Sequence, residues 1–114
     1  MSRMQREKGK RGEREVAKIL QEAGYSNARR GQQFCGKSGD ADVIGLPNVH
    51  IEVKRTEQCR AYDYWDQSVA DAREGEIPIV VHRQSGKEWL AIMAFDDFLE
   101  MYEKAYPDSK DLII

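Results

Sequence analysis

The stretch Val49-His-Ile-Glu-Val-Lys-Arg55 decides the fold, because its apolar and polar residues alternate as they do in a β-strand. Successive side chains of a strand point to opposite faces, so Ile51 and Val53 share one face while Glu52 and Lys54 share the other. An acid and a lysine are therefore expected as neighbours on the polar face of this strand. Taken alone the pair is a weak signal, since a solvated strand face often carries one.

The segments around this strand alternate between helical and extended patterns. Apolar residues at helical spacing predict a first helix from about Lys10 to Gly24. Further extended segments are expected at 26–34, 41–45, 77–83 and 88–95, with a hairpin at 84–87, and further helices at 63–74 and 96–105. The order αβββαββα predicts an α/β fold around a mixed central sheet. Residues 1–114 are expected to form a single domain with a basic, flexible N-terminal segment at about 1–9.

A second acid, Asp42, lies on the extended segment that precedes the central strand. Antiparallel partners on one face have a constant sum of residue numbers, so Asp42 opposite Glu52 requires Ile44 opposite His50 and a five-residue loop at 45–49. A loop of even length without a bulge would instead put the two carboxylates on opposite faces. His50 itself, like His82, lies in an apolar run, where a structural role is expected.

The first helix supplies a third acid. Glu13 lies three and four residues before Val16 and Ala17, on the stripe expected to face the sheet, whereas Glu15 is about 200° round the helix from Glu13. We therefore expect Glu13 to point inward and Glu15 outward. The alternative is that Glu13 lies in an exposed first turn, where the helix dipole favours an acid.

Together Asp42, Glu52, Glu13 and Lys54 make a site of hard oxygen ligands beside a cation, which suits Mg²⁺, or Mn²⁺, and lacks soft ligands. Such a cation polarises a phosphodiester oxygen and lowers the pKa of a bound water. The lysine can orient that water or stabilise the negative charge that builds up on the phosphorus centre. This chemistry predicts hydrolysis of a nucleic-acid backbone.

The composition favours a globular protein of the cytoplasm: 40% of the residues are hydrophobic, 33% are charged, and no apolar run approaches the ~20 residues that span a bilayer. No membrane association is expected. The net charge of −2 hides an asymmetry, because residues 1–37 carry ten Lys or Arg and four acids while residues 38–114 carry eight and sixteen. The basic first third suits a polyanion that touches one face, or is simply a solvated chain start.

In order along the chain, KGKRGERE at 8–15, AD at 41–42 followed by VIG, and IEVK at 51–54 resemble the motifs of the PD-(D/E)XK nuclease superfamily. The resemblance is closest to the archaeal-type Holliday junction resolvases and their phage-like relatives. It covers about residues 8–55 by motif and the rest by element order. It implies a restriction-endonuclease-like fold in which Asp42, Glu52 and Glu13 bind the metal, Lys54 is the catalytic lysine and Arg14 contacts phosphate.

This resemblance also implies DNA as the partner, four-way junctions as a candidate substrate, and a homodimer that places one site on each of two strands. Apolar residues in IPIVV at 77–81, EWLAIMAF at 88–95 or the terminal DLII at 111–114 could supply the dimer face. Ala41 stands where the superfamily name has proline. The candidates for phosphate contact are basic residues of the first third and one at the end of the central strand: Arg3, Arg6, Lys8, Lys10, Arg11, Arg14, Arg29, Arg30, Lys37 and Arg55.

Two further residues are auxiliary candidates. Gln67 resembles a polar residue that related nucleases place near the lysine, and Ser38 could align with a loop serine of the resolvases. Beside Gln67, Trp65 is more simply explained by packing on the sheet. Tyr62 and Tyr64 could stack on an unpaired base, but aromatic residues at a helix start more often belong to the core.

Residues 31–38, GQQFCGKS, match the phosphate-loop pattern GxxxxGK[ST]. A phosphate loop leaves a buried apolar strand and opens directly into a helix, whereas here SNARR precedes and a turn with an extended run follows. We therefore expect no nucleotide cofactor and interpret the segment as a polar connection that leads to Asp42.

The sequence thus predicts a magnesium-dependent endodeoxyribonuclease that cuts branched DNA. One alternative is a non-specific or nicking DNA endonuclease of the same fold. The other is a non-catalytic DNA-binding module, against which the presence of all four polar site positions argues.

Overall fold

A computed structural model describes residues 2–32 and 41–111. Within these ranges the elements follow the expected order, with five strands, three α-helices and one short 3₁₀ turn. The bounds are α1 Arg3–Glu22, β1 Arg29–Arg30, β2 Val43–Ile44, β3 Val49–Arg55, α2 Ala61–Asp71, β4 Ile77–Arg83, β5 Leu90–Ile92, α3 Phe95–Ala105 and η1 Ser109–Asp111. The predicted α/β fold with a mixed sheet is confirmed, and it is compatible with a restriction-endonuclease-like fold.

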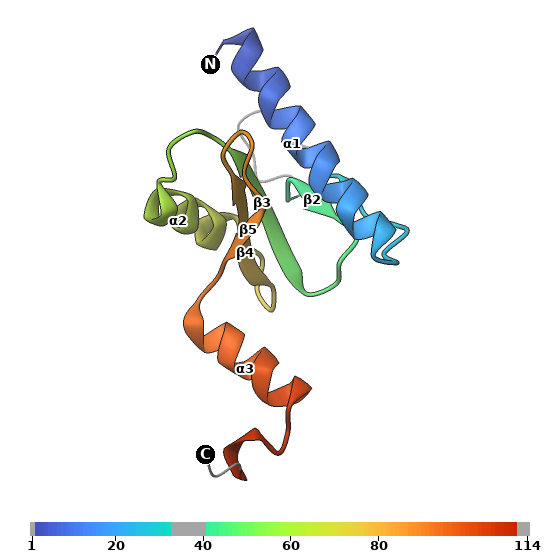
Figure 1. Ribbon diagram of the computed structural model, residues 1–114, viewed down its shortest axis with the longest axis vertical. Helices are drawn as coiled ribbons and strands as arrows, with labels where there is room; N and C mark the ends of the chain where they lie inside the picture. Colours follow the sequence, from blue (N-terminus) through green and yellow to red (C-terminus); the bar gives the residue numbers. More distant parts are fainter. Residues whose placement is uncertain (1, 33–40, 112–114) are drawn as a thin grey trace.

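The strands form one sheet in the order β1-β2-β3-β4-β5. Only β3 and β4 run parallel; the other three neighbouring pairs are antiparallel. The parallel pair needs a crossover, and α2 supplies it. Figure 1 shows α1 and α2 on either side of the sheet and α3 beyond its lower end, away from both.

The first helix begins at Arg3, so the expected start near Lys10 is wrong and the basic segment that follows Ser2 is helical. Ser2 and Gln5 explain the early start, because they form a capping box. The Ser2 hydroxyl accepts the backbone N–H of Gln5, and the Gln5 side chain accepts that of Ser2. This start also rules out the alternative that Glu13 lies in an exposed first turn.

Strands β3 and β4 have the predicted bounds, while the others are shorter than predicted. Strand β1 covers two residues of the predicted 26–34, and β5 covers three of the predicted 88–95. The ends of β1, β2 and β5 are set by where hydrogen bonding to the neighbouring strand stops. A periodic pattern in the sequence does not show that point.

The core lies between α1 and the face of the sheet that carries Ile51 and Val53, where Val16 and Ala17 of α1 pack against them. Gly12 lets the helix approach this closely. A Cβ at Gly12 would stand 3.2 Å from the Cβ of Arg55 and 3.5 Å from a methyl group of Val53, so even alanine would push α1 away from β3.

The turn between β2 and β3 depends on Gly45, whose φ of 111° is a conformation that L side chains rarely adopt. A Cβ there would also lie 2.6 Å from the backbone of Ala28. With this turn in place, Val43 pairs with Ile51, and their residue numbers have the sum of 94 that was required for Asp42 and Glu52 to share a face. Of the two arrangements that the sequence left open, the structure has the one that puts Asp42 and Glu52 on the same face.

Candidate functional site

Asp42 lies immediately before β2 and is buried, with 8% of its surface exposed. Its Oδ2 accepts the backbone N–H of Val53 at 2.8 Å. Strand β2 begins only at Val43, so the Val53 amide of β3 lies beyond its end. The Asp42 carboxylate supplies the hydrogen-bond acceptor for that amide. This contact fixes the Asp42 side chain against the middle of β3.

Glu52 is buried as well, with 4% of its surface exposed, and its carboxyl group interacts with that of Asp42. Burial raises the pKa of Asp42 to about 7, and the charges of Glu52 and Glu13 add to the rise. Burial alone would also raise the pKa of Glu52, but hydrogen bonds with His50 and Asp42 lower it overall. Of the two coupled carboxyl groups, Asp42 therefore binds a proton more readily than Glu52.

Glu13 of α1 points inward, as expected, and its side chain is 17% exposed. It is engaged by Arg30 of β1, whose Nε lies 3.1 Å from Glu13 Oε1. Within residues 2–32 and 41–111, no group of three or more Asp, Glu, His or Cys side chains is arranged to hold a metal ion. The two acids brought together are Asp42 and Glu52; Glu13 is close enough to affect the pKa of Asp42 but is bound to an arginine.

Glu15 does not point outward, and that expectation is wrong. Its two carboxylate oxygens bind Arg55 at 3.2 Å and Arg83 at 3.3 Å, across strands β3 and β4. The side chains of Arg55 and Lys54 point to opposite faces of β3, so this ion cluster lies on the α1 side of the sheet. Arg55, a candidate for phosphate contact, is occupied by Glu15 and only 15% exposed at its side chain.

Lys54 continues the face that carries Glu52. Its Nζ donates to Gln67 Oε1 at 2.9 Å and lies 5.5 Å from the centre of the Tyr64 ring. Tyr64 is itself held, because its hydroxyl lies 2.7 Å from the Thr56 hydroxyl and donates to the carbonyl of Gln58. Helix α2 thus holds the lysine through two side chains one turn apart.

The other aromatic and auxiliary candidates have different surroundings. Tyr62 is 82% exposed, so the core alternative is wrong for it. Ser38 and Lys37 lie outside the described residues, and of the segment with phosphate-loop letters only Gly31 and Gln32 are described. The strand before it, β1, consists of two arginines rather than a buried apolar run.

His50 is the site neighbour that the sequence interpretation missed. It is buried on β3, and its Nε2 lies 2.8 Å from Glu52 Oε1. Its Nδ1 lies 3.9 Å from Glu76, whose Oε1 also accepts the backbone N–H of Arg73 at 2.8 Å. The hydrogen bond with Glu52 raises the pKa of His50. The period-two alternation of His50, Glu52 and Lys54 was the signal that could have revealed this contact.

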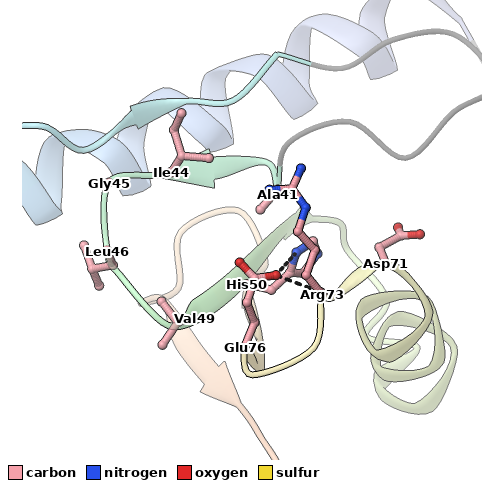
Figure 2. Close-up of a pocket in the computed structure, with 9 residues that line it drawn as sticks. All are labelled: Ala41, Ile44, Gly45, Leu46, Val49, His50, Asp71, Arg73 and Glu76. Atoms are coloured by element: carbon pink, nitrogen blue, oxygen red, sulfur yellow. Dashed lines mark hydrogen bonds and ion pairs between the residues drawn. The ribbon is translucent and has the colours of Figure 1, made fainter.

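Figure 2 shows the pocket on the far side of His50, with a volume of about 100 Å³, where His50 and Glu76 point toward each other. Asp71 and Arg73 line the same pocket from the end of α2. His50 precedes Lys54 by four residues, or roughly 13 Å of strand. The pocket therefore lies behind the histidine that contacts Glu52, at the other end of β3 from the lysine.

Several basic candidates for phosphate contact lie along α1: Arg3, Arg6, Lys8, Lys10, Arg11 and Arg14. Lys8 contacts Glu57 at 3.1 Å and Lys10 lies 3.9 Å from Glu7, both at the surface. Arg29 is exposed, with its guanidinium donating to the carbonyl of Asn27. Apart from Lys37, all the candidates are described, and most of them are exposed.

Comparison with known protein families gives a match to the "Phage putative PDDEXK endonuclease" family over residues 4–113. The chain belongs to this family. No curated protein and no solved structure matches. The resemblance to the PD-(D/E)XK superfamily is thereby confirmed, and the family supports an endonuclease with DNA as its substrate. No helix in the described part of this PDDEXK family member is both long and apolar enough to cross a membrane.

The raised pKa of Asp42 makes a stability test possible. Asp42 has a pKa of about 7 in the folded PDDEXK family member against an ordinary value of 3.8, so the folded state holds a proton that the unfolded chain releases. Stability without metal is therefore expected to fall as pH rises from about 4 to about 7, by a few kcal/mol at roughly 1.4 kcal/mol per pKa unit. His50, whose pKa is also raised, contributes in the same direction near neutral pH.

Thermal unfolding measured from pH 4 to pH 8 checks this, with the Asp42→Asn variant as control. The asparagine side chain does not titrate between pH 4 and pH 8, so the melting temperature of the variant should fall less over that range. A divalent cation held by the ionised pair would raise the melting temperature of the parent more at pH 8 than at pH 5. An equal pH dependence in parent and variant would show that Asp42 does not hold the proton.

Proposed function

We propose that this protein is a divalent-metal-dependent endonuclease that hydrolyses DNA phosphodiester bonds, with branched DNA such as four-way junctions as its preferred substrate. The observation that supports it best is a pair of buried, interacting carboxyl groups, Asp42 immediately before β2 and Glu52 on β3. Lys54 lies two residues further along the same face of β3.

The acid pair fits a hard cation by its chemistry. Two carboxyl groups forced together in a buried site are unfavourable when both are ionised, and a divalent cation would remove that repulsion. Asp42 and Glu52 would hold Mg²⁺ or Mn²⁺, with Glu13 as the third acid once it leaves Arg30. When bound, the cation would polarise a phosphodiester oxygen and lower the pKa of a water.

Each protein group then has a separate task. His50 binds one oxygen of Glu52 and so orients its carboxyl group toward Asp42 and the cation. Lys54, fixed by Gln67 and Tyr64, would stabilise the negative charge that grows on the phosphate oxygens or orient the attacking water. The exposed basic residues of α1, together with Arg29, would contact DNA phosphates and set its position without reading sequence.

Cutting a junction requires two sites on two strands, so we propose a homodimer as the active form, working in the cytoplasm. The strongest alternative is a nicking or non-specific endonuclease with the same site and no preference for branches. A DNA-binding module without catalysis is the other alternative.

A cleavage panel tests the proposal: a four-way junction, a flap, a nicked duplex and a linear duplex of equal length, each with Mg²⁺ and with Mn²⁺ at the same ionic strength. We expect at least about tenfold faster cutting of the junction than of the linear duplex, and no product in the presence of a chelator. Equal rates on all four DNAs would favour the non-specific enzyme. DNA binding without any product under any cation would favour the non-catalytic module.

A further inference from the structure

Helix α3 is amphipathic to an extent that the endonuclease site does not explain. At about 100° per residue, its apolar residues fall within an arc of about 160° and its charged residues within the opposite arc of about 120°. The apolar set is Phe95, Phe98, Leu99, Met101, Tyr102, Ala105 and the C-cap Tyr106; the charged set is Asp96, Asp97, Glu100, Glu103 and Lys104. Such a stripe is typical of a helix that faces a hydrophobic core.

No residue of α3 is buried by the described part of the chain. The six large apolar side chains from Phe95 to Tyr106 are between 38% and 70% exposed. Four of them form a row of aromatic rings, Phe95, Phe98, Tyr102 and Tyr106, with successive centroids 5.9, 6.1 and 4.9 Å apart. The row is preformed on the surface, and little conformational freedom would be lost on covering it.

The position of α3 makes the exposure costly. Figure 1 shows the helix beyond the end of the sheet, apart from α1 and α2. It has 11 residues, and isolated helices shorter than ~12–15 residues are only marginally stable in water. A helix of this length persists when its apolar face packs against a partner, so the stripe needs a surface that the described part of the chain does not provide.

We propose that the α3 face pairs with the α3 face of a second copy of this chain, across a two-fold axis. If each fully exposed large side chain contributes ~200 Å², the stripe offers about 600 Å² per chain and about 1,200 Å² for the pair. That total reaches the lower end of the range for specific, stable protein interfaces. The apolar stripe by itself is therefore large enough to hold two copies together.

The order of residues along the stripe suits pairing with itself. Phe95 and Tyr106 lie at equal distances from its middle, and so do Leu99 and Tyr102. In an antiparallel pair, each end of one stripe meets the other end of the second, so Phe95 opposes Tyr106 and Leu99 opposes Tyr102. The charged arc, with Glu100 at its centre, points away from the contact on both chains.

This inference places the dimer face on α3, of which only Phe95 belongs to the segments that the sequence suggested. The whole of the β4 segment 77–81 pairs with β3, and Val80 and Val81 also pair with β5. Of 88–95, Leu90 and Phe95 are exposed, whereas DLII falls mainly outside the described residues. The pairing does not depend on the proposed nuclease activity, although it would supply the two sites that cutting a junction requires.

Sedimentation equilibrium of the full chain at several concentrations, without DNA or divalent cations, tests the pairing. The parent should show a monomer–dimer equilibrium, and the Asp42→Asn variant should show the same one, which separates this result from any loss of cleavage. Phe98→Lys should raise the dimer dissociation constant at least about tenfold, because the ammonium would be buried at the contact. Glu100→Lys puts the same residue on the opposite arc of α3 and should leave the dimer intact.

Raising the salt concentration should preserve or tighten the dimer, because the contact is apolar and the charges lie outside it. Tryptophan fluorescence, from Trp65 and Trp89 outside α3, reports whether each variant keeps its folded sheet. A parent chain that stays monomeric at every concentration would overturn the proposal, whatever the variants do. A folded Phe98→Lys variant that pairs as tightly as Glu100→Lys would overturn it too.

Discussion

Replacing Asp42 with asparagine is expected to lower the rate of DNA cleavage by about three orders of magnitude or more while DNA binding survives. The change removes one of the two carboxylates that would hold the cation, and loss of several kcal/mol of transition-state stabilisation corresponds to that factor. Asparagine keeps an oxygen that can accept the backbone N–H of Val53, so the local structure should persist. The measurements are single-turnover cleavage and DNA binding in the absence of metal.

Glu52→Gln serves as the companion variant, because it removes the other carboxylate and leaves a side chain of the same size beside His50. The Asp42→Asn variant should not melt at a lower temperature than the parent at pH 8, since it relieves the repulsion between two buried acids. Glu74→Gln, a change of an exposed acid beyond α2, is the matched control and should cut at the parent rate. If Asp42→Asn or Glu52→Gln also cut at the parent rate, the assignment of the site would be wrong.

Lys54→Ala is expected to slow cleavage by about 10²- to 10³-fold with little change in DNA affinity. The ammonium lies on the same strand face as Glu52, where it would act on charge that develops only during the reaction. A loss confined to the rate of the chemical step, at saturating DNA, distinguishes this role from ordinary phosphate binding.

Two further variants serve as controls for the Lys54→Ala measurement. Lys18→Ala removes an exposed lysine of α1 and should leave the rate unchanged. Gln67→Ala removes the acceptor of the Lys54 hydrogen bond but not the charge, and Tyr64 still lies beneath the ammonium, so a smaller loss of about tenfold or less is expected. A Lys54→Ala variant that cuts within about threefold of the parent would show that this lysine is not part of the chemistry.

The sequence predicted the element order and the bounds of β3 and β4, because these strands are the longest and their apolar patterns are local. It named the residue sum that would bring Asp42 opposite Glu52, but the loop allowed either register, and the structure decided between them. The roles of Asp42, Glu52, Glu13 and Lys54 in catalysis stay predictions, which the variants above test.

Other features depended on partners that are distant in the sequence. Glu15 was expected to face solvent from its place on the α1 helical wheel, yet Arg55 and Arg83 reach it from two strands of the sheet. His50 was interpreted as structural because its run is apolar, but it contacts Glu52 on the same face. The period of a helix or strand predicts the direction in which a side chain points. It does not predict whether a long charged side chain from another element reaches it.

By itself, the sequence determined which residues alternate, where the acids and the lysine lie along the chain, and that one strand carries Glu52 and Lys54 on one face. The tertiary structure decided which acids meet: Asp42 and Glu52 come together, while Arg30 binds Glu13. It also decided that the apolar stripe of α3 stays uncovered by the described residues. The physical reason is that backbone periodicity is local, whereas burial and ion pairing depend on which surfaces the folded chain brings within a few ångströms of each other.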